Sequence, residues 1–156
     1  MKTIEGQFTQ ISGKFAIVAA RFNQLIVDRL VAGSVDAFTR HGVPDDSLEL
    51  VWVPGSFELP QVAKKLAGSG EYVAVVCLGC VIQGETDHYD YVCSQTAGGI
   101  AQAGMETGIP VIFGVLTCGT LEQAMNRAGG KAGNKGADAA LAAIEMVSLL
   151  KQLPPN

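Results

Sequence analysis

His88, one of the two histidines of the chain, lies in a segment crowded with polar side chains that begins at Gly84. Histidine gains and loses a proton near neutral pH, which suits a general acid or base. Glu85 and Thr86 precede it where a helix is expected to start, so free backbone amides and a threonine hydroxyl are suited to hold a phosphate group. The segment therefore indicates proton transfer beside an anion. A solvated loop histidine and an ordinary helix cap explain the same residues, and that alternative stays open.

A second polar segment runs from Arg127 to Gly136 and holds three cations and four glycines in ten positions. This mixture suits an anionic ligand that approaches the backbone closely. The segment is not a Walker loop, because the Gly-Lys-Ser/Thr ending is missing and no strand is expected before it. A plain linker between helices with solvated lysines remains the alternative. The other histidine, His41, stands at an expected helix end, where the helix dipole favours a cation, and we expect it to be structural.

Four apolar segments alternate with helical patterns along the chain, which predicts an α/β fold with a four-stranded parallel sheet covered on both faces. The expected strands are Lys14–Ala20, Leu48–Val53, Tyr72–Ile82 and Val111–Thr117. The first helix is expected to begin at Asn23, a good cap, and to stop at Gly42. Its apolar stripe consists of Val27, Leu30, Val31, Val35 and Phe38. The other expected helices are Glu58–Ala67, His88–Thr107, Thr120–Arg127 and Asn134–Lys151.

The expected third helix has an unusual interior, because Gly98, Gly99 and Gly104 lie within it. Each glycine inside a helix costs about 1 kcal/mol relative to alanine, so a close contact must compensate. Two explanations stay open at this point. The helix packs against the sheet of its own domain, or it packs against copies of itself in an oligomer.

Ligands of open parallel sheets bind at the carboxyl ends of the strands, so we expect the functional residues in the segments that follow the strands. They are Arg21–Asn23, Pro54–Glu58, Gln83–His88 and Cys118–Thr120. Three phenylalanines, Phe22, Phe57 and Phe113, lie at or near these ends, where a flat heterocycle could stack on one of them. The alternative for each phenylalanine is a place in the core.

Composition excludes several classes of protein. The chain has 156 residues, 48% of them hydrophobic, which suits one domain with its own core. A net charge of −4 without a Lys/Arg block argues against a nucleic-acid partner. No apolar run reaches the length of about 18 residues that a membrane span needs, and the start of the chain lacks the apolar stretch of a signal peptide, so we expect a cytosolic protein.

Neither a metal site nor a redox pair is expected. The four cysteines are predicted to be free thiols, as is usual in a reducing compartment. Cys77 and Cys80 are spaced so that their side chains point to opposite faces of one strand, which disfavours a redox pair or zinc site. A GxGxxG fingerprint is missing after the first strand, which argues against a nicotinamide enzyme.

Five segments in order along the chain carry a resemblance to a known family. They are Ala20–Asn23, Val51–Pro60, Gly84–Tyr91, Pro110–Thr117 and Arg127–Gly136. Together they resemble the lumazine synthases, which carry out the penultimate step of riboflavin biosynthesis. The resemblance covers nearly the whole chain. It implies a flavodoxin-like three-layer α/β/α sandwich and a single domain over residues 1–156, with an N-terminal arm (1–12) and a C-terminal tail (152–156).

The resemblance also implies the reaction and the roles of the site residues. A ribitylamino-substituted aminouracil condenses with dihydroxybutanone phosphate to dimethyl-ribityllumazine, with loss of phosphate and water and without a cofactor or metal. His88 would shuttle protons, and Phe22 would stack on the pyrimidine ring. The remaining substrate contacts would come from Ser56, Phe57 and Glu58 on the ribityl chain, from the backbone of Cys80, Val81 and Ile82 with Lys135 on the ring edge, from Glu85, Thr86 and Arg127 around the phosphate, and from Phe113 of an adjacent subunit.

The family also forms assemblies, and the resemblance implies a pentamer with the glycine-rich third helix around the five-fold axis. A shell of twelve pentamers, a riboflavin synthase as partner enzyme, and pairing of the N-terminal arm with a neighbouring subunit are further expectations. Two positions depart from the family pattern: Gln83 replaces a usual Arg or Lys, and Glu85 replaces a small residue. Both make the phosphate site less positive. The alternative function is a non-catalytic, shell-forming relative that binds flavin or lumazine, against which His88 and Arg127 argue.

Overall fold

A parallel sheet of four strands, in the order β2-β1-β3-β4, forms the centre of the computed structural model, which describes residues 1–155. Its strands are β1 (Lys14–Ala20), β2 (Leu48–Val53), β3 (Tyr72–Ile82) and β4 (Val111–Cys118). The sequence predicted all four strands, and β4 extends one residue further than expected. The fold is flavodoxin-like, as predicted.

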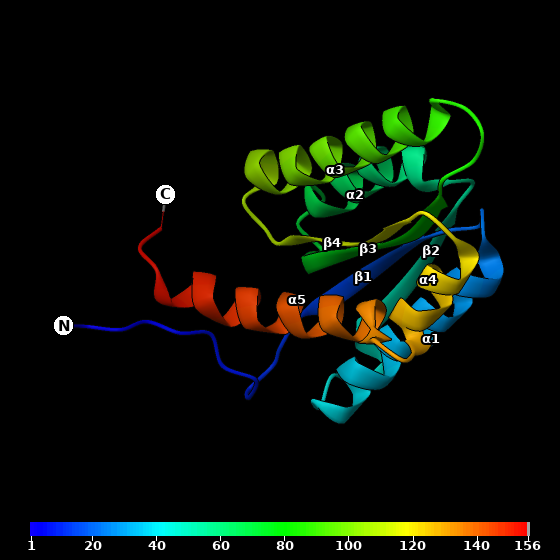
Figure 1. The fold of residues 1–156 in the computed structure, drawn as a ribbon. Coiled ribbons are helices and arrows are strands. Elements are labelled where there is room, and N and C mark those ends of the chain that lie inside the picture. The colour runs from blue at the N-terminus through cyan, green and yellow to red at the C-terminus, as the bar shows by residue number, and fades with distance from the viewer. Residues whose placement is uncertain (156) are drawn as a thin grey trace.

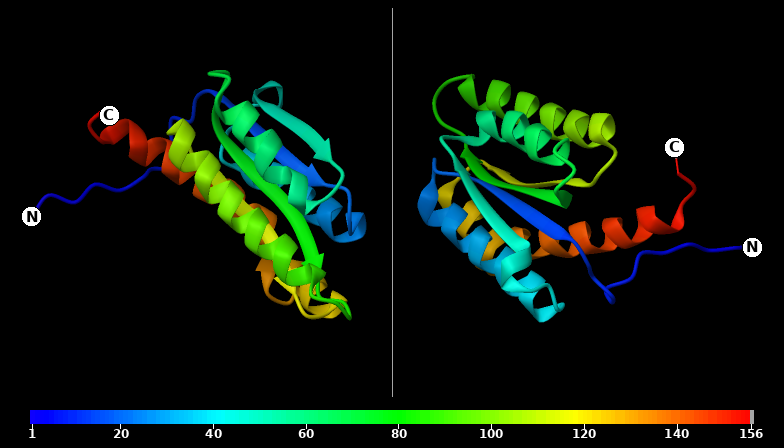
Figure 2. Two further views of the ribbon diagram at one scale, coloured as in Figure 1. Left: turned by 90° about the horizontal axis from the view of Figure 1, so that it is seen from above. Right: turned by 180° about the vertical axis from the view of Figure 1, so that it is seen from behind.

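Helices cover both faces of this sheet (Figures 1 and 2). On one face lie α2 (Leu59–Ala67) and α3 (His88–Thr107), and on the other lie α1 (Gln24–Arg40), α4 (Leu121–Arg127) and α5 (Lys135–Gln152). Alternate residues of β1 enter the two cores: Phe15, Ile17 and Ala19 face α1 and α5, whereas Ala16 and Val18 face α2 and α3. Burial on both faces explains why the central strands β1 and β3 are almost continuous apolar runs.

The start of α1 differs from the prediction. Asn23 precedes the helix, but its side chain makes no hydrogen bond to the first turn, and its backbone is left-handed with φ 60° and ψ 42°. The amide nitrogen of Asn23 instead donates to the carbonyl oxygen of Cys80, 2.8 Å away. The expected cap is therefore wrong, because a contact across the sheet edge takes this side chain away from the helix.

The segment between α4 and α5 is not a plain linker. A short antiparallel hairpin of β5 (Ala128–Gly130) and β6 (Gly133–Asn134) occupies it, which the sequence did not reveal. The amide oxygen of Asn134 accepts from the backbone N–H groups of Gly136 and Ala137, and its amide nitrogen donates to the carbonyl of Arg29 on α1. Asn134 thus caps α5 and joins it to α1.

The glycines of α3 have different surroundings. A Cβ atom added at Gly99 would lie 2.6 Å from Cβ of Pro60 on α2, so this glycine permits close packing within the chain. A Cβ atom added at Gly104 would lie at ordinary contact distance from Val111, whereas one added at Gly98 would meet no atom of residues 1–155 within 4 Å. Packing within the domain therefore explains Gly99, and it leaves Gly98 unexplained.

The N-terminal arm, residues 1–12, lies beside α5 (Figure 1). The backbone N–H of Gln7 donates to the hydroxyl of Ser148, and the side chain of Gln152 donates to the carbonyl of Glu5. The predicted tail starts at 152, where α5 ends, and its last residue, Asn156, lies outside the described residues.

Candidate active site

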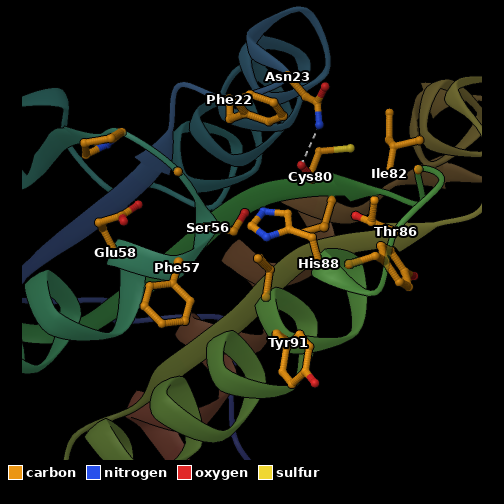
Figure 3. Close-up of a pocket in the computed structure, with 16 residues that line it drawn as sticks. Phe22, Asn23, Ser56, Phe57, Glu58, Cys80, Ile82, Thr86, His88 and Tyr91 are labelled. Carbon is orange, nitrogen blue, oxygen red and sulfur yellow. Dashed lines mark hydrogen bonds between the residues drawn. The ribbon is translucent and has the colours of Figure 1, made fainter.

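A cavity of about 690 Å³ opens at the carboxyl ends of β1, β2 and β3, at the start of α3 (Figure 3). This volume suits a small organic substrate. Nine of the predicted site residues line the cavity: Phe22, Ser56, Phe57, Glu58, Cys80, Val81, Ile82, Thr86 and His88. They come from four separate parts of the chain, and the parallel sheet brings them to one edge.

The loop after β2 forms one wall of the cavity. Ser56 begins a short 3-10 helix, Ser56–Glu58, and is buried against Gly79 of β3, where an added Cβ would lie 2.5 Å from the serine Oγ. The hydroxyl of Thr96 on α3 donates to the carbonyl of Ser56 at 3.1 Å, in a buried position. These contacts fix the wall that carries Phe57 and Glu58.

Aromatic side chains around the cavity are exposed to an unusual degree. Phe22 is 73% exposed, Phe57 56% and Tyr91 70%. Large apolar side chains gathered at a cavity mouth mark a surface that binds a ligand or another protein. A flat ring that enters the cavity would remove part of this apolar surface from water.

His88 is the first residue of α3, and its imidazole extends into the cavity toward Ser56 (Figure 3). The side chain of Asp87, at the cap position, makes no hydrogen bond to the first turn of α3. Backbone N–H groups at a helix start carry a partial positive charge, and here Gly84 and Thr86 line the cavity just before them. The site therefore combines a group that can transfer protons with donors suited to an anion.

Four predicted site residues do not line this cavity: Glu85, Phe113, Arg127 and Lys135. Glu85 is exposed on the loop between two residues that do line it. Phe113 lies on the edge strand β4 and is 38% exposed. Arg127 ends α4 and Lys135 begins α5, on either side of the hairpin. The two of them that follow β4, Arg127 and Lys135, are thus outside the lining that the ends of the other three strands provide.

Three lining residues of α3 were not predicted: Tyr89, Tyr91 and Val92. Tyr91 and Val92 follow His88 by three and four positions, so the helical spacing alone places them on its face. Asn23, predicted as a helix cap, also lines the cavity, as does Gly84, which begins the polar segment expected beside a phosphate. Pro54 and Gly55 complete the lining from the end of β2.

The cysteines near the site are buried thiols. Cys77 and Cys80 belong to the cores on opposite faces of β3, as predicted, and all four cysteines are free. Burial, with a smaller contribution from Cys118, raises the pKa of Cys80 to about 12. Burial also raises the pKa of Cys118, and the positive charge of Arg127 acts in the opposite direction. In residues 1–155 no group of His, Cys, Asp and Glu side chains is arranged to hold a metal ion.

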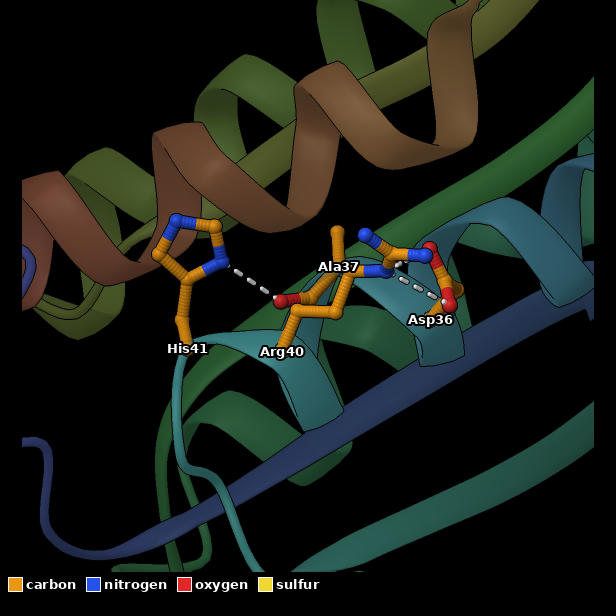
Figure 4. Close-up of polar contacts among 4 residues, drawn as sticks. All are labelled: Asp36, Ala37, Arg40 and His41. Carbon is orange, nitrogen blue, oxygen red and sulfur yellow. Dashed lines mark hydrogen bonds and ion pairs between the residues drawn. The ribbon is translucent and has the colours of Figure 1, made fainter.

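His41 is remote from the cavity and has a local role (Figure 4). Its Nδ1 donates to the carbonyl of Ala37 at 2.8 Å, at the end of α1. The neighbouring Arg40 pairs with Asp36 at 3.0 Å on the exposed side of the helix. The histidine thus gives a hydrogen-bond partner to a carbonyl in the last turn of α1, which agrees with the structural role that the sequence predicted for His41.

Comparison with known families agrees with the resemblance seen in the sequence. The model of the 6,7-dimethyl-8-ribityllumazine synthase family matches residues 12–151, which is most of the chain. None of the helices in residues 1–155 is long and apolar enough to cross a membrane. The matched range includes every strand of the sheet and every residue of the cavity. The chain belongs to the lumazine synthase family, transferases whose reaction is the condensation step of riboflavin biosynthesis.

Proposed function

We propose that this chain condenses 5-amino-6-(D-ribitylamino)uracil with 3,4-dihydroxy-2-butanone 4-phosphate in the cavity at the carboxyl edge of the sheet. The observation that carries the proposal is the gathering of Phe22, Ser56, Glu58 and His88 around one cavity of suitable size. The exposed ring of Phe22 provides a stacking surface for the pyrimidine. Ser56 and Glu58 provide polar groups for the hydroxyls of the ribityl chain.

In the proposed reaction, the ring amine attacks the ketone carbonyl, and an imine forms with loss of water. Loss of phosphate then requires that a proton leave carbon and that charge on the leaving group be stabilised. His88 transfers the protons, and the start of α3 with Thr86 holds the phosphate. The ribitylamino nitrogen finally closes the second ring, with loss of a second water. Holding two substrates together supplies much of the rate enhancement, so proton transfer by His88 is a modest contribution.

The residues outside the cavity are proposed to act from a neighbouring copy of the chain. Phe113, Arg127 and Lys135 do not line the cavity of their own chain, and the exposed aromatics at its mouth are suited to cover by a second copy. We propose a pentamer in which α3 faces its copies, with the open side of Gly98 at that contact. Assembly of pentamers into a shell, and a riboflavin synthase that consumes the lumazine, complete the proposal.

The test is to mix the purified protein with both substrates and to record lumazine absorbance and phosphate release against the uncatalysed reaction. Product and phosphate forming together above background support the proposal, and His88→Ala is expected to slow turnover by about tenfold to a hundredfold. A rate equal to background, with lumazine still bound, would instead indicate the non-catalytic binding relative. Light scattering that shows a monomer of one chain would contradict the shared site.

A further inference from the structure

The hydrogen bonds at the end of β1 depart from the regular pattern of a parallel sheet. In a strand, successive backbone groups point to alternate sides. The N–H of Arg21 donates to the carbonyl of Val53, on the β2 side, at 2.8 Å. The N–H of Phe22 is therefore expected to point toward β3, but it also donates to the β2 side, to the carbonyl of Pro54 at 3.1 Å. This leaves β3 without its next backbone donor.

The side chain of Asn23 supplies the missing donor. Its amide nitrogen lies 2.8 Å from the carbonyl oxygen of Cys80, in a partly buried position (Figure 3). The left-handed backbone of Asn23, at φ 60°, is uncommon for a residue other than glycine, although asparagine tolerates it better than most. Asn23 accepts this conformation without capping α1, so the contact with Cys80 is the only side-chain hydrogen bond that it makes within residues 1–155.

The bond to Cys80 determines which backbone groups of β3 remain open. Gln83 donates to the carbonyl of Cys118 on the β4 side, so by alternation Cys80 and Ile82 present their backbone groups on the opposite side, toward β1. β1 has ended at this height, and both residues line the cavity. With the Cys80 carbonyl held by Asn23, the N–H and C=O of Ile82 are the next pair along this edge.

We propose that Asn23 is a positioning residue for the pyrimidine ring, an inference that rests on the proposed function. Its amide replaces the backbone of β1, fixes the peptide after Cys80, and keeps the backbone of Ile82 in register as an adjacent donor and acceptor. Such a pair matches a ring edge that carries a carbonyl beside an N–H, as a pyrimidinedione does. Phe22, its neighbour in the chain, lines the same cavity.

Two substitutions separate the amide from the backbone conformation. Asn23→Gly adopts the left-handed conformation freely and removes only the donor. Asn23→Asp keeps the shape but turns an acceptor toward the Cys80 carbonyl. Gln10→Gly is the matched control, because Gln10 is the other non-glycine residue with positive φ, at 57°, and it lies in the N-terminal arm away from the cavity.

We expect Asn23→Gly to weaken lumazine binding by about tenfold and to raise the KM for the aminouracil similarly, and Asn23→Asp to have a larger effect. The KM for the butanone phosphate is expected to stay within about twofold of wild type. Hydrogen exchange at the end of β3, followed by mass spectrometry, is expected to be faster in both variants. Gln10→Gly is expected to change none of these quantities.

Unchanged lumazine binding in both Asn23 variants, or an equal rise in both KM values, would overturn the positioning role. An equal loss in Gln10→Gly would assign the effect to general stability and would overturn it as well. Wild-type protein that neither binds lumazine nor forms it would refute the proposed function instead. Hydrogen exchange at the end of β3 would still test the contact between Asn23 and Cys80, since it needs no substrate.

Discussion

The two halves of the carboxyl edge of the sheet contribute to the site in different ways. The ends of β1, β2 and β3 enclose a cavity within one chain, and Ser56, Cys80 and His88 line it. In the half that follows β4, Arg127 ends α4 and Lys135 begins α5, on either side of the hairpin, and neither residue lines that cavity. The first half forms a cavity with aromatic side chains at which a flat ring could stack, whereas the cations of the second half lie outside that cavity.

The proposed sharing of the site between copies of the chain rests on this difference. A ring can stack and find polar partners in the cavity of a single chain, but no lysine or arginine among the described residues lines it to pair with the phosphate substrate. If the phosphate binds at the start of α3, the carboxylate of Glu85 on the same loop would oppose it. A cationic side chain from a neighbouring copy would supply the positive charge that this position lacks.

The largest effect is expected for the second half. Arg127→Ala should raise the KM for the butanone phosphate by about tenfold or more, because a charge-assisted contact to phosphate is lost, and leave lumazine binding nearly unchanged. Steady-state kinetics with each substrate varied in turn measures both values. Arg40→Ala is the control, since it removes the same charge at the remote end of α1. Equal KM changes in the two variants would remove the distinction between the halves.

The next largest effect is expected for Asn134, whose hydrogen bonds stabilise the second half of the edge. Asn134→Ala removes two cap hydrogen bonds of α5 and the bond to the carbonyl of Arg29, so the free energy of unfolding should fall by about 1 to 2 kcal/mol. Asn134→Asp keeps the cap acceptor and should lose less. Urea unfolding followed by circular dichroism provides the measurement. An unchanged midpoint in Asn134→Ala would mean that the hairpin is not held by this side chain.

Two adjacent glycines of α3, on the cavity side of the molecule, are expected to respond to substitution in opposite ways. Gly99→Ala would place its Cβ 2.6 Å from Pro60 and should destabilise the chain by about 1 kcal/mol or more. Gly98→Ala meets open space and should stabilise an isolated chain by about 1 kcal/mol through helix propensity. If copies of α3 cover Gly98, the same substitution should weaken the oligomer, which sedimentation velocity can detect. Stabilisation without any change in assembly would place Gly98 outside the contact.

The smallest effect concerns Cys118, which reports on Arg127. The pKa of this thiol is raised by burial and lowered in part by the nearby guanidinium, so Arg127→Ala should raise it further. Alkylation at pH 9 should then become a few-fold slower at Cys118, because less thiolate is present, and stay the same at Cys77. Peptide mass spectrometry measures both sites. Faster alkylation at Cys118 would show that Arg127 acts as a cover and not through its charge.

The sequence predicted the sheet well because its two central strands, β1 and β3, are almost entirely apolar runs. It missed the hairpin of β5 and β6, since glycine-rich segments of two or three residues show no periodicity. It misjudged Asn23 because the competing acceptor, the carbonyl of Cys80, is 57 positions away in the chain.

The sequence predicted the part of the candidate site that follows from the geometry of the sheet. Residues that follow β1, β2 and β3 converge on the cavity because parallel strands end at one edge. Tyr91 and Val92 could have been predicted from their helical spacing to His88. The convergence of strand ends does not extend to Phe113, which lies within β4, or to Arg127 and Lys135, whose positions depend on how α4, the hairpin and α5 pack.

The most direct test of the shared site is to mix two inactive variants, one for each half. Thr86→Glu places a carboxylate at the expected phosphate position in the cavity, and Arg127→Glu reverses the charge of the second half. After joint dissociation and reassembly, mixed oligomers should regain about a quarter of the wild-type activity, since that share of the sites combines two intact halves. Mixed oligomers with no more activity than the separate variants would show that both halves of each site belong to one chain.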